Sequence, residues 1–248
     1  LKRYVNFLNN PDEKTAVEQF GKGDKYLGIC TLMVTLPGLP MFGHGQVEGF
    51  AEKYGMEYQR AYYDEQPDGD LIYRHEREIF PLSRKRYLFS GVENFMLYDF
   101  FAPEGGVNED VFAYSNRAGN ERSLVVYNNK FANARGWIRT SAAFAVKTGN
   151  GDEKVLRQKT LSDGLGLHGE HDDWVIFRDV IAGLEYIRNS REIKERGLYL
   201  ELGAYGRNVF LDWREVRDEN GTYARLASML NGRGTPSIDE AVRELALQ

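Results

Sequence analysis

The hydrophobic pattern of this chain changes near Val92, and that change limits the folds open to it. Before Val92, short apolar runs alternate with longer helical stretches, a rhythm typical of parallel strands covered by helices. After Val92, short strand-like runs follow one another between turn-rich segments, which indicates antiparallel structure. The 248 residues therefore predict an α/β part at 1–90, an all-β part at 91–217 and a helical tail at 218–248.

The first part contains two units in which a strand is followed by a helix. The expected strands are the apolar runs Tyr4–Leu8 and Leu39–Phe42, and helical patterns follow each of them. Consecutive units of this kind imply parallel strands joined by right-handed crossovers. A complete (β/α)8 barrel needs about 250 residues. Because only the first third of this chain shows the rhythm, the chain could hold the end of such a barrel but not all of it.

The second part reads as a series of short strands. The clearest hairpin pairs Val111–Ser115 with Ser123–Tyr127. The remaining strand-like runs are Asn94–Phe100, Trp137–Thr140, Lys154–Arg157, Trp174–Phe177, Leu198–Leu202 and Asn208–Trp213. Short strands at this spacing favour an antiparallel β-sandwich.

Helical patterns interrupt and close this part of the chain. One helical insert is expected at Gly183–Arg196. Two helices are expected in the tail, at Tyr223–Leu230 and Ile238–Leu247. The second opens with the capping box Ser237–Glu240, in which a serine hydroxyl and a glutamate three residues later satisfy the first helical amides.

Composition excludes several classes of protein. A formal net charge of −5 argues against a nucleic-acid-binding surface, and no apolar run is long enough to span a membrane. Cys30 is the only cysteine, so neither an internal disulfide nor a cysteine-based zinc site is expected. The cellular compartment is not predicted, although the lack of disulfides slightly favours the cytoplasm. The chain starts in a strand-like run and ends in a helical pattern, so we expect a fragment whose partner is the N-terminal remainder of a parent chain.

Polar residues follow the first predicted strand directly, in the order Asn10-Pro11-Asp12-Glu13. Barrel enzymes place catalytic groups at the carboxyl ends of strands, where a carboxylate such as Asp12 can stabilise developing positive charge. The alternative is a helix start, with Asn10 as N-cap, Pro11 in the first turn and the two acids facing the positive end of the helix dipole. The residues alone leave both interpretations open.

A glycine-rich segment, Gly43–Gly49, follows the second predicted strand. It lacks the G-x-G-x-x-G spacing of a dinucleotide-binding turn, and no cofactor is expected. Its glycines let the backbone turn sharply at a strand end near a ligand. Gln46 and Glu48 are then either polar contacts to that ligand or anchors of the loop.

Other polar or aromatic clusters carry weaker signals. The segment His168–Asp173 matches no zinc template, and Asp64–Asp70 fails the calcium-loop pattern, so no metal site is expected. Trp137, Trp174 and Trp213 could stack on sugar rings, but each lies in a strand-like run, which favours core packing.

Two of these segments together resemble a known family, the α-amylase superfamily (glycoside hydrolase family 13). Tyr4–Asp12 is similar to the family's fourth conserved region, in which the seventh barrel strand ends in Asn-His-Asp. Leu36–Met41 followed by Gly45–Gly49 is similar to the next landmark, a Pro-Gly-x-Pro strand that leads into a Gly-Gln/Asp-Glu-Gly loop at the eighth strand. The order and the spacing of the two motifs match those of the family.

This resemblance implies a fold, a mechanism and roles for residues. The fold would be the last two β/α units of a TIM-type barrel followed by an antiparallel β-sandwich. The family acts on α-glucans by a retaining mechanism, and Asp12 would be its transition-state-stabilising carboxylate. Asn10, Gln46 and Glu48 would bind the glucan or malto-oligosaccharide. The nucleophile and the acid/base would come from strands outside this chain, which could therefore not carry out hydrolysis alone.

One departure from the family's pattern supports a different hypothesis. Pro11 stands where the family has a histidine that also contacts the sugar. A non-catalytic carbohydrate-binding or scaffold protein with a degenerate barrel is therefore the main alternative. A third hypothesis is that residues 92–248 act as an interaction module.

Overall fold

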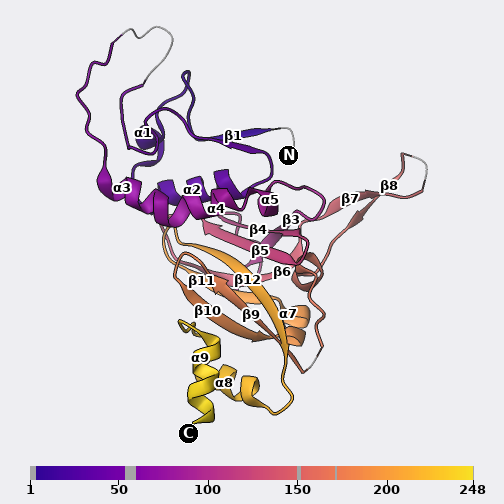
Figure 1. Ribbon diagram of the computed structural model, residues 1–248. Helices are drawn as coiled ribbons and strands as arrows, with labels where there is room; N and C mark the ends of the chain where they lie inside the picture. Colours follow the sequence, from indigo (N-terminus) through magenta and orange to yellow (C-terminus); the bar gives the residue numbers. More distant parts are fainter. Residues whose placement is uncertain (1–3, 54–59, 150–151, 171, 248) are drawn as a thin grey trace. The chain divides into compact units, whose positions relative to one another are not determined.

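The computed structural model describes residues 4–53, 60–149, 152–170 and 172–247, and it divides into two compact units (Figure 1). The units are Leu1–Glu93 and Asn94–Gln248. The tail expected at 218–248 falls within the second of these units, and its status as a separate domain stays a prediction. No helix in the described ranges is both long and apolar enough to cross a membrane.

The first unit is built on a pair of parallel strands. β1 (Val5–Phe7) pairs with β2 (Leu39–Met41) in parallel, with Val5 opposite Leu39, which confirms the predicted strand direction. Between them run α1 (Ala16–Phe20) and α2 (Asp24–Thr35), with Gly21 as the C-cap of the first helix and Gly23 as the N-cap of the second. The side chains of α2 that form the core of this unit are Tyr26, Leu27, Cys30, Met33 and Val34.

The helical stretch after β2 is not one regular helix. It consists of α3 (Gly69–Arg74), a π-helical turn η1 (His75–Ile79), α4 (Phe80–Arg84) and α5 (Arg86–Phe89). Asp68 caps α3 by accepting a hydrogen bond from the amide of Leu71. The guanidinium of Arg86 donates to the carbonyls of Val34, Leu36 and Gly38, and so satisfies acceptors at the end of α2 and the turn that follows it.

The second unit is organised around one antiparallel sheet of eight strands. Its order is β10-β9-β12-β5-β4-β3-β6-β11. The strands are β3 (Met96–Phe101), β4 (Val111–Ala118), β5 (Glu121–Asn128), β6 (Ala134–Ser141), β9 (Asp173–Asp179), β10 (Leu184–Asn189), β11 (Leu198–Leu202) and β12 (Arg207–Arg217). The sheet is continuous and curled (Figure 1), so it fits a sandwich or a half-barrel.

Smaller elements complete the second unit. A separate hairpin joins β7 (Phe144–Lys147) to β8 (Lys154–Arg157), and α6 (Leu161–Leu165) follows it. The tail forms α8 (Thr222–Leu230) and α9 (Ile238–Ala246), which confirms both expected helices. The hydroxyl of Ser237 accepts from the amide of Glu240, as the capping box predicts.

The helical insert expected at Gly183–Arg196 is half wrong. Leu184–Asn189 is strand β10, and only Ser190–Arg196 is helical, as α7. Gly183 has a φ of 72°, which allows a tight turn from β9 into β10, and pairing with β9 then overrides the helical propensity of this stretch. The side chain of Asn189 accepts from two amides of the next turn and starts α7 there.

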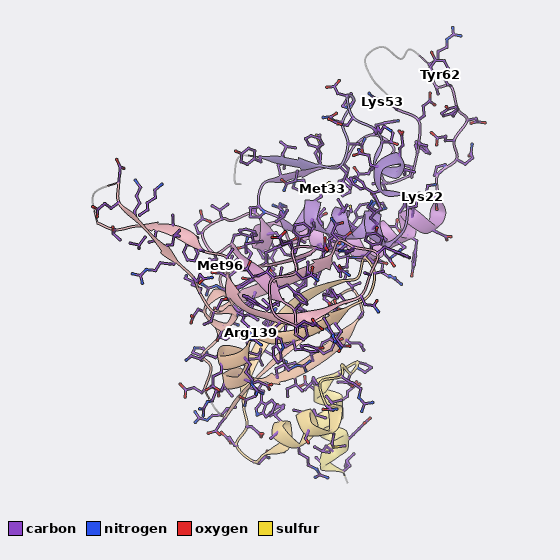
Figure 2. All side chains as sticks on the ribbon, turned by 180° about the vertical axis from the view of Figure 1, so that it is seen from behind. Lys22, Met33, Lys53, Tyr62, Met96 and Arg139 are labelled. Atoms are coloured by element: carbon purple, nitrogen blue, oxygen red, sulfur yellow. The ribbon has the colours of Figure 1, made fainter. Side chains whose placement is uncertain are left out.

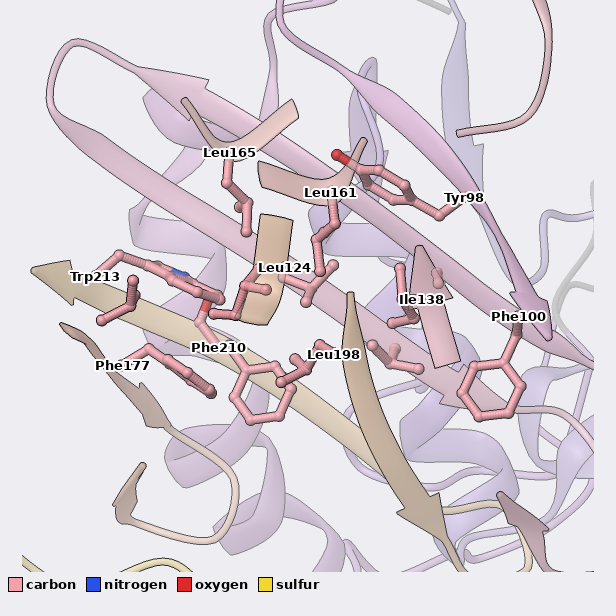
Figure 3. Packing of buried hydrophobic residues seen from close by; sticks show 14 of the residues in the cluster. Tyr98, Phe100, Leu124, Ile138, Leu161, Leu165, Phe177, Leu198, Phe210 and Trp213 are labelled. Atoms are coloured by element: carbon pink, nitrogen blue, oxygen red, sulfur yellow. The ribbon is translucent and has the colours of Figure 1, made fainter. Parts of the chain in front are cut away.

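Aromatic rings form the centre of the core of the second unit (Figure 3). Phe177 stacks on Trp213 with ring centroids 4.4 Å apart and meets Phe210 edge-on at 5.1 Å. Trp213 therefore packs in the core, as its strand position indicates. Trp137 and Trp174 are only half-buried.

Phe177→Ala should strongly destabilise the second unit, because it leaves a ring-sized cavity between two other aromatic side chains. We expect the free energy of unfolding to fall by about 3–5 kcal/mol. Phe131→Ala is the control, since that ring is 82% exposed, and should change it by about 0.5 kcal/mol or less. Urea denaturation followed by tryptophan fluorescence measures both variants. Equal stabilities for the two would contradict this assignment of the core.

Candidate functional site

The polar segment after β1 forms a turn and not a helix start. The side-chain carbonyl of Asn10 accepts hydrogen bonds from the amides of Asp12 and Glu13, both at 2.9 Å. The helix begins only at Ala16, where the hydroxyl of Thr15 accepts from the amide of Glu18. The helix-cap interpretation of Asn10 is therefore wrong. An Asx turn competes successfully with helix initiation at this point.

The carboxyl ends of β1 and β2 approach each other closely. A Cβ on Gly43 would lie 2.4 Å from the side-chain nitrogen of Asn9, so only glycine fits at this position without displacing Asn9. Asn9 is 6% exposed, and its side-chain oxygen has no hydrogen-bond partner among the residues that the structure describes. Buried polar atoms are normally paired, so an unpaired acceptor at a strand end points to a ligand or a water molecule as its partner.

A pocket of about 170 Å³ lies at these two strand ends. It is lined by Asn9, Asn10, Pro11, Glu13, Thr15, Met41, Phe42, Gly43, His44, Glu52 and Lys53. Of the four residues predicted as site residues, only Asn10 is in this lining. Asp12 is exposed at the turn, and its backbone carbonyl accepts from Nζ of Lys53 at 2.8 Å. The adjacent Glu13 is the acid of this segment that lines the pocket.

Gln46 is an anchor of the glycine-rich loop. Its Oε1 accepts from the amide of Gly43 at 2.9 Å, and its Nε2 donates to the hydroxyl of Tyr26 at 3.2 Å. At 2% exposure, this amide is fully engaged inside the unit. Of the two roles predicted for Gln46, ligand contact and loop anchor, its position therefore matches the loop anchor. Glu48 is half-buried, lies outside the pocket lining, and accepts with its backbone carbonyl from the amide of Asp68.

The chain of hydrogen bonds continues from Tyr26 to the π-helical turn. The hydroxyl of Tyr26 lies 2.7 Å from Nε2 of His75, and Nδ1 of His75 lies 2.9 Å from the carbonyl of Leu71. Because a carbonyl can only accept, Nδ1 carries the proton and Nε2 accepts from Tyr26. Burial lowers the pKa of His75 and raises that of Tyr26, which keeps both groups neutral.

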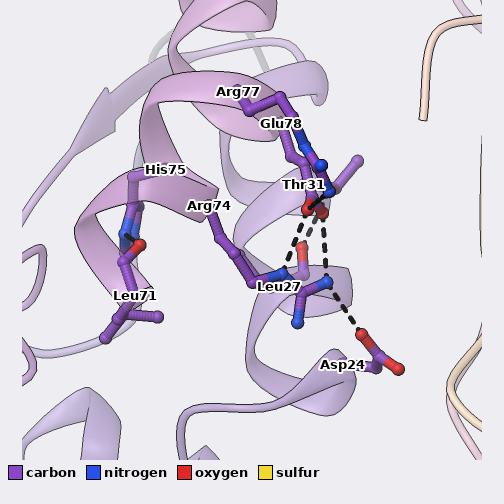
Figure 4. Close-up of polar contacts among 8 residues, drawn as sticks. All are labelled: Asp24, Leu27, Thr31, Leu71, Arg74, His75, Arg77 and Glu78. Atoms are coloured by element: carbon purple, nitrogen blue, oxygen red, sulfur yellow. Dashed lines mark hydrogen bonds and ion pairs between the residues drawn. The ribbon is translucent and has the colours of Figure 1, made fainter. Parts of the chain in front are cut away.

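An ion-pair cluster fixes the same π-helical turn on α2 (Figure 4). Arg74 donates to both carboxylate oxygens of Glu78, at 3.0 and 3.2 Å, and to Asp24 at 2.9 Å. Arg77 adds a contact of 2.8 Å to the same buried glutamate. Since these carboxylates are held by arginines, we assign the cluster a structural role.

Two acids that the sequence does not reveal hold the segment beside the pocket, and one of them, Glu52, belongs to its lining. The carboxylate of Glu52 accepts from the amides of Tyr62 and Tyr63, and that of Glu65 accepts from the amides of Ala51 and Glu52. Lys53 and Tyr62 of this loop are labelled in Figure 2. These acids stand in a generally acidic loop with no distinctive spacing, so only the fold could identify them.

The pocket offers groups suited to a neutral, hydroxylated ligand. Asn9 supplies an unpaired acceptor, Glu13 a carboxylate, Lys53 a cation and Phe42 an aromatic ring. Both oxygens of Glu52 are already bonded to backbone amides. Across the part of the chain that the structure describes, no group of three or more side chains is arranged to hold a metal ion.

Gly43→Ala tests the close approach of the strand ends. The added methyl group must displace Asn9, so we expect a loss of about 1–3 kcal/mol in the free energy of unfolding. Gly69→Ala is the matched control, because a Cβ there meets nothing within 4 Å and Gly69 lies in a helix. The control should be neutral or slightly stabilising. Thermal denaturation followed by circular dichroism compares the two, and equal behaviour would contradict the close approach.

The pKa of His75 makes the first unit sensitive to acid. Since the folded pKa is below 6.5, the unfolded chain binds the proton more readily than the folded one. Stability should be complete above about pH 6.5 and fall as the pH drops toward the lowered folded pKa. Glu48 and Glu78 oppose this shift without reversing it. His75→Gln should remove the slope, and NMR titration of the imidazole measures the pKa. Titration at or above pH 6.5 would contradict the buried, neutral state.

Known proteins resemble this chain in their solved structures. No family model and no curated protein matches the sequence. Solved structures do match, and one is an α-amylase from Geobacillus thermoleovorans in complex with acarbose. It has 13% sequence identity and a TM-score of 0.54, and the alignment covers 86% of this chain and 39% of that one.

Two further structures have a similar fold. One is a noncanonic maltogenic α-amylase from Thermotoga neapolitana, with 18% identity, a TM-score of 0.54, and coverage of 84% of this chain and 41% of that one. The other is a debranching enzyme from Nostoc punctiforme soaked with acarbose, with 14% identity, a TM-score of 0.51, and coverage of 84% and 33%. This chain spans well under half the length of each. It therefore has the fold of part of an α-amylase-superfamily enzyme, which confirms, for the fold, the resemblance that its two sequence motifs indicate.

Proposed function

We propose that this chain supplies the last two β/α units of an α-amylase-type barrel and contributes to a site for an α-glucan. The observation that carries the proposal is the pocket at the carboxyl ends of two adjacent parallel strands, where barrel enzymes bind their substrates. The fold is that of enzymes of which two were studied with acarbose. The ligand proposed for this chain is a malto-oligosaccharide or a longer α-glucan.

Within the described residues, the parallel strands β1 and β2 lack the neighbours and the cover that such strands normally have. Parallel sheets are normally covered on both faces, and two-stranded sheets are rarely stable alone. Yet Val5, Phe7, Leu39 and Met41 are 46%, 42%, 63% and 39% exposed. We infer that further strands pair with and cover β1 and β2, and that the N-terminal remainder of a parent chain provides them.

In this proposal the complete site acts by the retaining mechanism. The nucleophile and the acid/base come from the additional strands, and Asp12 stabilises the positive charge that develops on the sugar. Its place in the turn fixed by Asn10 supports this role, because the turn follows directly after β1. Asn10 and Glu48 are proposed to contact the glucan. Gln46 is proposed to act through the loop conformation that it anchors.

The main alternative is a carbohydrate-binding or scaffold protein without catalysis. Two observations favour it specifically: Pro11 replaces the family's histidine, and the exposed Asp12 is outside the pocket lining. Under this alternative, Glu13 and the unpaired oxygen of Asn9 bind the sugar, and no reaction follows.

Paired variants of the two adjacent acids distinguish these functions. In a protein that joins this chain to barrel strands bearing the nucleophile and the acid, Asp12→Asn should lower kcat by about 100-fold or more. Glu13→Gln should mainly weaken the binding of maltotetraose, because it lines the pocket. Glu18→Gln, on the exposed face of α1, is the control for both.

The outcomes separate cleanly in steady-state kinetics and calorimetry. Near-normal turnover by Asp12→Asn would remove Asp12 from the mechanism. Binding of maltotetraose without hydrolysis by the unmodified protein would favour the carbohydrate-binding alternative. Absence of binding by the unmodified protein would overturn both.

A further inference from the structure

A second pocket lies in the β-rich unit, where the curled sheet brings its two edge strands to one place. The pocket has a volume of about 350 Å³, within the range typical of small-molecule sites. β10 contributes Tyr186 and Arg188, and β11 contributes Leu198–Glu201. These strands stand at opposite ends of the sheet order, so the pocket occupies the seam between the edges. Asn231 and Gly232, after α8, complete the rim.

The floor of this seam pocket is apolar and aromatic. Phe177 and Phe210 are each 1% exposed and lie among its lining residues. Tyr186 stacks on Phe177 at 5.9 Å with an angle of 17° between the rings, and meets Phe210 edge-on at 6.0 Å. Trp213 covers the other face of Phe177 at 4.4 Å, so Phe177 and Phe210 support the pocket from beneath, and the half-buried Tyr186 and Leu200 are the groups that can contact a flat apolar ligand.

Charged groups of opposite sign stand on the two strands that border the pocket. Arg188 donates to the carbonyls of Ile187 and Gly232, and its guanidinium lies 5.7 Å from the ring centroid of Tyr186. In the described part of the chain no carboxylate forms an ion pair with it. Glu201, on β11, accepts from the hydroxyl of Tyr199 at 3.0 Å. A guanidinium has five N–H donors, and within the described ranges those of Arg188 bond to two carbonyls, so it retains donors for an oxyanion.

We propose that the seam pocket binds a small aromatic oxyanion, with its anionic group on Arg188, its ring against Tyr186 and Leu200, and a hydroxyl directed to Glu201. A glucan is a poorer match. Its hydroxyls need many polar partners, whereas the amide of Asn208 is bonded to Asp179 and the hydroxyl of Tyr199 to Glu201. This site belongs to the second unit and is independent of the proposed glucan site.

Calorimetric titration with 4-hydroxyphenylacetate tests the proposal on the full chain. The methyl ester of this probe lacks the charge and should bind at least about tenfold more weakly. A tenfold loss of affinity corresponds to the loss of about one charge-assisted hydrogen bond. Inorganic phosphate, which lacks the ring, should also bind more weakly. Equal affinity for the acid and its ester, or for the acid and phosphate, would overturn the proposal.

Variants locate the binding. Arg188→Gln should abolish the preference for the acid over the ester. Arg139→Gln is the matched control, because that exposed guanidinium lies over Trp137 at 5.2 Å and is outside the pocket lining. Since Arg188 also holds Gly232, a second variant, Leu200→Trp, fills the pocket with an added ring and leaves Arg188 in place. The thermal transition verifies that the Leu200→Trp protein is folded. If this folded variant binds the acid with unchanged affinity, the proposal is overturned. It is also overturned if Arg188→Gln still prefers the acid over the ester.

Discussion

The first unit depends on a continuous line of hydrogen bonds that joins a strand end to a helix. It runs from the amide of Gly43 through Gln46 and Tyr26 to His75 and ends at the carbonyl of Leu71. Gln46, Tyr26, His75 and Leu71 are buried, so water does not compete for the bonds between them, and each bond sets the direction of the next. The glycine-rich loop is therefore held from inside the unit, and Gly43 and Asn10 both lie in the lining of the strand-end pocket.

The residues that the motif identifies and the residues that line the strand-end pocket overlap only at Asn10. The motif also singles out Asp12, Gln46 and Glu48, whereas the lining contains the neighbouring Asn9, Glu13 and Glu52. One residue along a turn changes which side of the backbone a side chain occupies. A motif fixes the strand end to within a residue or two, whereas the chemistry of the site depends on which neighbouring side chain points inward.

The sequence was sufficient for features that depend on local patterns. The parallel pair β1 and β2 and the cap of α9 at Ser237 follow from apolar periodicity and capping chemistry. It was insufficient where distant segments decide the outcome. Leu184–Asn189 has a helical pattern but becomes a strand because β9 is available for pairing. No sequence pattern near Glu52 or Glu65 predicts the hydrogen bonds of their carboxylates. Glu52 accepts from amides in the segment before Glu65, and Glu65 accepts from amides beside and at Glu52.

The directional line of bonds from Gly43 to Leu71 also restricts how such a chain can diverge. Gln46, Tyr26 and His75 each supply one donor and one acceptor, so replacing a single member leaves a buried neighbour unpaired. Replacing adjacent members together, with side chains of matching shape, avoids that penalty. In an evolving lineage these three positions are therefore expected to covary, and drift at one of them should be rare unless a compensating exchange accompanies it.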